Sequence, residues 1–150
     1  MKKKIAVLTL CAMLFALCVA AEAQQTGKIF RIGFLDPSNA SGSAGLVEVF
    51  LQELGKLGWI EGKNFIIEYR FGEQKPERVP ELAADLVRLK VDLIVVSGIT
   101  AALAAKKATT TIPIVMTSSA DPVALGLVAS LARPGGNVTG LSACGRLRGR

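Results

Sequence analysis

Histidine is absent from this sequence, which removes the side chain that most often serves as a general base near neutral pH. The sequence also lacks the G-x-S-x-G nucleophile turn, the phosphate-binding loop G-x-x-x-x-G-K and the dinucleotide fingerprint G-x-G-x-x-G. Cysteine is scarce: after Cys11 and Cys18 only Cys144 remains, and no base accompanies it. These absences argue against an enzyme, and we expect no catalytic residue, no metal site and no cofactor.

Long apolar runs are also rare, and the most prominent one lies at the N-terminus. The lysines Lys2–Lys4 precede an apolar run over Ile5–Ala21, which ends in the small-x-small pattern Ala21-Glu22-Ala23. These are the three parts of a secretory signal. A transmembrane anchor is the alternative, but the run falls below the roughly 20 strongly apolar residues of a spanning helix. We therefore predict a cleavable signal peptide over residues 1–23 and a periplasmic location.

The charges of the chain do not form a stripe of one sign. The formal net charge is +6, but part of it belongs to the predicted signal peptide, and the remaining charges are mixed along the chain. We expect no nucleic-acid partner. Because one cysteine remains after cleavage, no intramolecular disulfide can form, and residues 24–143 must fold around an apolar core. Residues 144–150, CGRLRGR, lack apolar periodicity and are predicted to be an irregular tail.

Segments of strand character alternate with segments of helical periodicity. Val47, Phe50, Leu51, Leu54 and Leu57 recur at the spacing of one helix face, whereas residues 92–96, DLIVV, show no polar–apolar alternation, as in a strand covered on both faces. Strands are predicted at 28–35, 64–71, 92–96, 112–117 and 137–141, helices at 47–57, 76–90, 101–108 and 123–132, and a loop at 36–43. This order predicts an α/β fold with a doubly wound parallel sheet, because right-handed crossovers place helices on both faces.

Small polar residues follow the predicted strands at the points where each strand ends. In a parallel sheet these ends share one edge, where ligands bind. Hydroxyl and amide groups there can hydrogen-bond a solute, and glycine permits close approach of the backbone. The alternative is that each residue caps a helix or forms a turn. The polar residues at this edge are Asp36, Ser38, Asn39, Ser41, Ser97, Gly98, Thr100, Thr117, Ser118, Ser119, Asp121 and Ser142.

Two other protein classes share this order of strands and helices. A receiver domain needs an aspartate at the end of the third strand, where this chain has Ser97, so that class is excluded. A flavodoxin-like flavin-binding protein stays an alternative, because Ser41-Gly42-Ser43 resembles a hydroxyl-rich phosphate loop. Trp59 follows the first helix at the opposite edge of the sheet, and we assign it to packing.

Five segments of the sequence together carry a resemblance to a known family. They are RIGFL, FLQELGKLGWIEGKNFIIEYR, AADLVRLKVDLIVV, IPIVMTSSADPV and LARPGGNVTGLS, which span most of Ile29–Ser142. This combination resembles the substrate-binding proteins of ABC transporters, related to the members that bind tryptophan and other aromatic amino acids. The resemblance implies one lobe of a type I periplasmic binding fold with flavodoxin-like strand order. In such a protein two lobes close on a small solute, which passes to a permease in the membrane.

The resemblance also implies which residues touch the solute. By position they are Ser38 or Asn39, then Ser97, Gly98 and Thr100, then Ser118 and Asp121. Asp121 would pair with a ligand ammonium group or cap the helix that follows it.

Family members continue into a second lobe after G-L-S, so we expect a truncated chain that holds the first lobe only. The expected function is an extracytoplasmic solute-binding component for import of a small organic solute, such as an amino acid. The alternative is an exported sensory module that reports a similar ligand to a receptor.

Overall fold

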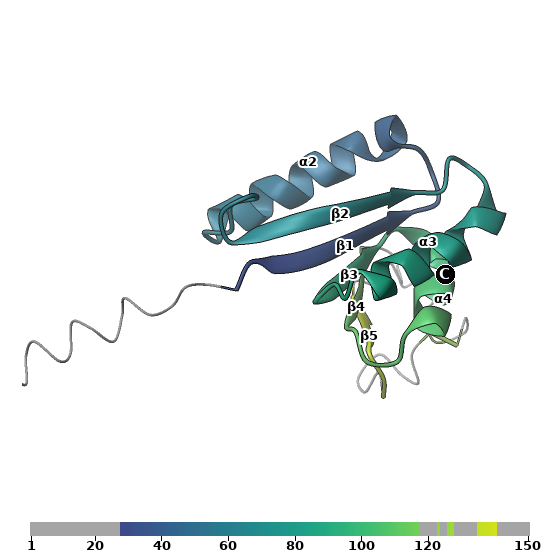
Figure 1. Ribbon diagram of the computed structural model, residues 1–150. Coiled ribbons are helices and arrows are strands. Elements are labelled where there is room, and N and C mark those ends of the chain that lie inside the picture. The colour runs from purple at the N-terminus through teal and green to yellow at the C-terminus, as the bar shows by residue number, and fades with distance from the viewer. Residues whose placement is uncertain (1–27, 118–122, 124–125, 128–134, 141–150) are drawn as a thin grey trace, which may run out of the picture.

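A parallel five-stranded sheet forms the centre of the fold. The computed structural model describes residues 28–117, 123, 126–127 and 135–140. Within these residues the strand order is β2-β1-β3-β4-β5, and every neighbouring pair is parallel (Figure 1). The strands are β1 (Phe30–Asp36), β2 (Phe65–Phe71), β3 (Leu93–Val96), β4 (Ile114–Met116) and β5 (Val138–Gly140). The predicted α/β class and flavodoxin-like strand order are therefore confirmed.

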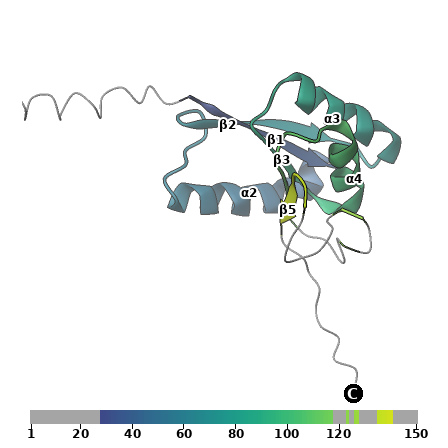
Figure 2. The ribbon, with the colours of Figure 1, turned by 90° about the horizontal axis from the view of Figure 1, so that it is seen from below.

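Helices cover both faces of this sheet (Figures 1 and 2). Helix α2 (Ala40–Lys56) packs on one face, and α3 (Val79–Arg88) and α4 (Gly98–Ala108) pack on the other. The connection from β1 to β2 runs toward one edge of the sheet, and the connection from β2 to β3 returns past β1. Right-handed crossovers in opposite directions place their helices on opposite faces. No helix in this described part of the chain is both long and apolar enough to cross a bilayer.

The central strand β1 contributes to the apolar core on both faces of the sheet. Phe34 joins Phe65 and Val95 in the cluster beneath α2, whereas Leu35 joins Leu86 of α3 in the opposite cluster. All five side chains are at most 1% exposed. A strand that is buried on both faces has no polar alternation, which explains why its sequence is almost continuously apolar.

Two helices begin earlier than the sequence indicated. Helix α2 begins at Ala40, within the predicted loop 36–43, because the Asn39 side chain accepts a hydrogen bond from Gly42 N at 2.8 Å and caps the helix. Helix α4 begins at Gly98 and not at residue 101. The prediction of a loop through residue 43 was therefore wrong, since small polar residues there form the first turn of α2.

Two further details of the predicted helices were wrong. Leu57 was expected on the apolar stripe of the first helix, but it is the C-cap of α2 and is 75% exposed. Of the helix predicted over 123–132, the structure describes three residues. Gly126 there has φ 66°, and its N–H donates to Val123 O at 2.9 Å, which is a turn.

Trp59 packs at the amino edge of the sheet. Its ring centroid lies 6.1 Å from that of Phe30 and 6.2 Å from that of Phe65, both in edge-on contact. These phenylalanines begin β1 and β2, so the prediction that Trp59 serves packing away from the candidate site is confirmed.

Asp92 ties together the amino ends of β1 and β3. Its carboxylate accepts hydrogen bonds from the Lys28 ammonium group and from Arg31 N, the latter at 2.9 Å. In return, Asp92 N donates to Arg31 O at 2.7 Å. The hydrogen bonds from Lys28 and Arg31 hold the pKa of the Asp92 carboxyl below its ordinary value of 3.8.

We expect the contribution of Asp92 to stability to disappear in acid. A carboxyl whose pKa is lowered by folding stabilises the native state above its ordinary value of 3.8, and this contribution is lost as the pH falls through the lower folded-state pKa. Asp92→Asn should therefore lower the melting temperature more at about pH 7 than at about pH 2, because protonation of the wild-type carboxyl in acid removes this contribution. Thermal unfolding followed by circular dichroism measures both differences. An equal difference at the two pH values would contradict this expectation.

Candidate ligand-binding site

Three loops meet at the carboxyl edge of the sheet. They follow β1, which ends at Asp36, β2, which ends at Phe71, and β3, which ends at Val96. Ser97 N donates to Leu35 O at 3.0 Å, so the loop after β3 begins directly beside the end of β1. This edge is where open parallel sheets bind ligands.

Asp36 places a buried carboxylate at this edge. The residue is 5% exposed, and its Oδ1 accepts a hydrogen bond from Ser38 N at 2.7 Å. Burial by itself raises the pKa of the Asp36 carboxyl, but hydrogen bonds from Ser38, Ser43 and Ser97 outweigh it, and the pKa lies below its ordinary value of 3.8. Asp36 is therefore negatively charged at neutral pH.

A pair of serine hydroxyls links the loop after β1 to helix α2. Ser38 Oγ lies 2.8 Å from Ser43 Oγ, and it can also donate to Asn39 O at 3.3 Å. Ser43 belongs to the first turn of α2 and is 3% exposed, whereas Ser38 is half-buried. The loop after β1 is thus fixed to helix α2 by a hydrogen bond between side chains, in addition to its covalent connection to β1.

The loop after β2 is joined to the same place through backbone hydrogen bonds. Gly72 N donates to Asp36 O at 2.8 Å, Glu73 N to Ser38 O at 3.0 Å and Gln74 N to Pro37 O at 2.9 Å. Glu73 and Gln74 have φ of 55° and 59°, which is an uncommon conformation for residues other than glycine. A turn that is this closely bonded holds the loops after β1 and β2 in one fixed arrangement.

The predicted contact residues do not all lie together. Ser38 and Ser97 both lie next to Asp36, whereas the Asn39 side-chain oxygen is occupied in capping α2, where it accepts from Gly42 N and Ser41 Oγ. Gly98, with φ 77°, starts α4.

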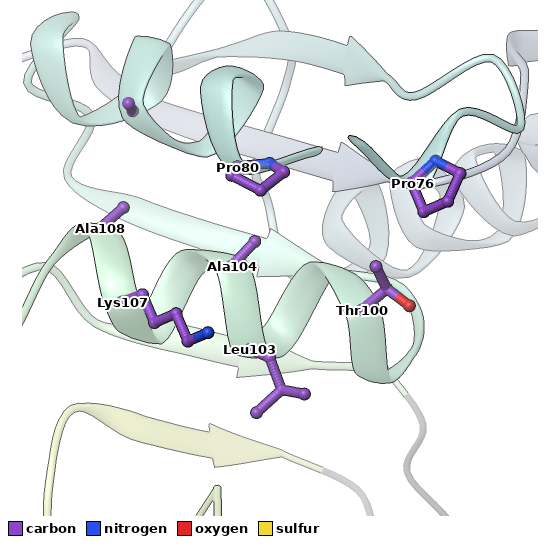
Figure 3. A pocket seen from close by; sticks show the side chains of 8 residues that line it. Pro76, Pro80, Thr100, Leu103, Ala104, Lys107 and Ala108 are labelled. Atoms are coloured by element: carbon purple, nitrogen blue, oxygen red, sulfur yellow. The ribbon is translucent and has the colours of Figure 1, made fainter. Parts of the chain in front are cut away.

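Thr100 lies apart from Asp36, Ser38 and Ser97. The Thr100 side chain lines a cavity of about 450 Å³ between α3 and α4, opposite Pro76 and Pro80 (Figure 3). Ser118 and Asp121 lie outside the described residues. The contact set as a whole therefore stays a prediction.

Sequence reasoning missed two features of this edge. Asp36 was counted among the polar residues after the first strand but not among the solute contacts, and Ser43 was treated as a loop residue. The signal for Ser43 was the N-cap preference of Asn39, which places the residue four positions later on the first turn of the helix. No signal in the sequence pointed to the turn after β2.

A second cavity, of about 510 Å³, lies on the α2 face of the sheet. Its lining is mostly apolar and includes Leu46, Val49, Val115 and Met116. Neither cavity is lined by Asp36, Ser38 or Ser97. Within the described ranges, no group of three or more Cys, Asp and Glu side chains is arranged to hold a metal ion.

A parallel sheet in this strand order, with polar groups at its carboxyl edge, is the architecture of a lobe of a type I periplasmic binding protein. Residues 37–148 match the family of ABC transporter substrate-binding proteins, and the chain belongs to that family. The predicted family resemblance is thereby confirmed.

Three relatives show how this chain compares with larger proteins. The tyrosine-binding protein of Clostridioides difficile (strain R20291) is 40% identical over 93 residues, which are 62% of this chain and 27% of the relative. A ligand-free, open substrate-binding protein with adhesive properties from Clostridium difficile has a TM-score of 0.71 and 32% identity, covering 76% of this chain and 39% of that chain. The ABC domain from Streptococcus pneumonia in complex with L-Trp has a TM-score of 0.69 and 30% identity, covering 77% and 39%. This chain thus spans well under half the length of these relatives.

Proposed function

We propose that this chain is the extracytoplasmic solute-binding component of an ABC transporter, and that its solute is an aromatic amino acid delivered to a permease for import. In this proposal residues 1–23 are the signal peptide, residues 24–143 form the binding lobe and residues 144–150 are an irregular tail. The lobe performs no chemistry on the solute. Relatives described as binding tyrosine and L-Trp support the choice of an amino acid.

The observation that carries the proposal is the polar arrangement at the carboxyl edge. Ser38 and Ser97, both half-buried, come from the loops after β1 and β3, and both hydrogen-bond the buried Asp36. Ser97 is the N-cap of α4 but makes no side-chain capping hydrogen bond. The first backbone N–H groups of α4 can therefore donate to a carboxylate, which the helix dipole also favours. An amino acid has one group that donates, its ammonium, and one that accepts, its carboxylate. The serine oxygens suit the ammonium group, and the N–H groups of α4 suit the carboxylate.

A thermal-shift screen of the purified protein tests this proposal. L-tyrosine and L-tryptophan should raise the melting temperature, because a ligand that binds only the native state adds about 2.7 kcal/mol of stability at about 100 times its Kd. Glucose and adenine, which lack the amino-acid head group, should leave the melting temperature unchanged. A cooperative melt that no amino acid shifts would contradict the proposal.

A further inference from the structure

The Asp36 carboxylate has no cationic partner of its own among the described residues. The ion pairs found there use Glu53, Glu68, Asp85 and Asp92, and none uses Asp36. Its hydrogen bonds come from uncharged donors, the N–H of Ser38 and serine hydroxyls. A buried negative charge that is solvated only by neutral dipoles still attracts a cation placed nearby.

The hydroxyl protons around Asp36 all have acceptors inside the protein. A serine hydroxyl has one proton and two lone pairs, and a carboxylate can only accept. The hydroxyls of Ser43 and Ser97 therefore donate where they bond to Asp36. Ser38 Oγ has Asp36, Asn39 O and Ser43 Oγ as acceptors. With the protons directed inward, the oxygen lone pairs of the half-buried Ser38 and Ser97 are left for a ligand.

From this geometry we propose that Asp36 is a positioning residue that makes the Ser38 and Ser97 side of the site an acceptor for the ammonium group of the amino-acid ligand. Because Asp36 is only 5% exposed, it acts through the hydroxyls that it orients and through its charge, without touching the ligand. The inference rests on the proposed function and adds to it which end of the ligand this side of the site recognises.

A pair of ligands that differ only in the ammonium group isolates this role. L-tryptophan carries the group, and 3-indolepropionate keeps the indole ring and the carboxylate but lacks it. Isothermal titration calorimetry on the wild-type protein and on Asp36→Asn gives the dissociation constant of each ligand. Asparagine keeps the size of the side chain but loses its charge, and its amide nitrogen cannot accept a hydroxyl proton.

The expected result is a change in discrimination between the two ligands. Asp36→Asn should weaken L-tryptophan binding by about tenfold or more, the usual scale for losing a hydrogen bond to a charged group. Binding of 3-indolepropionate should change by less than about twofold. Asp92→Asn is the matched control, because it removes a hydrogen-bonded aspartate at the opposite edge of the sheet and should leave the ratio of the two constants unchanged. Equal weakening of both ligands in Asp36→Asn would assign Asp36 a merely structural role and overturn the proposal.

A second measurement separates this inference from the proposed function. If the wild-type protein binds neither ligand, the proposed amino-acid specificity fails. The orientation of the serine hydroxyls can still be measured on the ligand-free protein. Proton NMR at low temperature should show a slowly exchanging hydroxyl proton at Ser97, which disappears in Asp36→Asn but persists in Asp92→Asn. Rapid exchange of this proton in the wild-type protein would overturn the positioning role.

Discussion

Leu86→Ala is expected to lower the free energy of unfolding by about 2 to 5 kcal/mol, the usual cost of removing a buried leucine side chain. Leu86 lies on the inner face of α3 and is 0% exposed. It covers Gly33 of β1 so closely that a Cβ built on this glycine would lie 2.9 Å from Leu86 Cδ1. The surrounding strand is buried on both faces and cannot move far to fill the space, so a cavity should remain.

Leu57→Ala is the matched control for this change. The same atoms are removed, but Leu57 is 75% exposed and lies at the end of α2. Its replacement should change the free energy of unfolding by no more than about 0.5 kcal/mol. Urea denaturation of both variants and the wild-type protein measures the difference. Similar losses in the two variants would mean that the α3 face of the sheet is not the core described above.

Gly72→Ala is expected to disturb both the fold and the candidate site. A Cβ at Gly72 would lie 2.7 Å from the carbonyl oxygen of Pro37, a backbone atom that cannot rotate away. The turn after β2 would have to shift, which would strain the hydrogen bond from Gly72 N to Asp36 O. Overpacking of this kind costs about 1 to 3 kcal/mol. Because the loop after β1 carries Ser38, amino-acid binding should weaken as well.

Gly45→Ala provides the opposite expectation for the same chemical change. Gly45 lies within α2, and a Cβ there would meet no atom within 4 Å. Alanine in a helix is favoured over glycine by about 0.5 to 1 kcal/mol, so this variant should be more stable than the wild-type protein. Thermal and urea unfolding of the two variants, followed by ligand titration, test the pair. Equal effects of the two substitutions would show that the close approach at Gly72 does not constrain the loop.

Most of the fold could be predicted because its strands and helices have clear periodicity. Residues 93–96, LIVV, are continuously apolar and form the buried strand β3, and Val79, Ala83 and Leu86, which lie at helical spacing in the segment predicted as a helix over 76–90, are all in the core. The start of α2 could not be predicted in the same way. Its first turn, Ala40–Ser43, consists of small residues common in loops, and its helical state depends on the capping hydrogen bond of Asn39.

The candidate site was predictable only as a location. Ser38 and Ser97 were chosen because they follow strands that end at one edge, and the structure places both beside Asp36. Thr100 was chosen on the same ground, yet its side chain lines the cavity between α3 and α4. Position after a strand indicates which edge a residue occupies, but the turn of the helix decides which way its side chain points.

The sequence by itself determined the order of strands and helices, the faces they bury and the family, because these depend on apolar periodicity and on local motifs. Only the tertiary structure decided that Asp36 lies buried among Ser38, Ser43 and Ser97, and that the turn at Gly72–Gln74 joins them. Apolar periodicity indicates which side chains of a strand or helix face the core. A hydrogen bond also requires a particular distance and direction between residues far apart in the chain, and these exist only once the loops have been brought together.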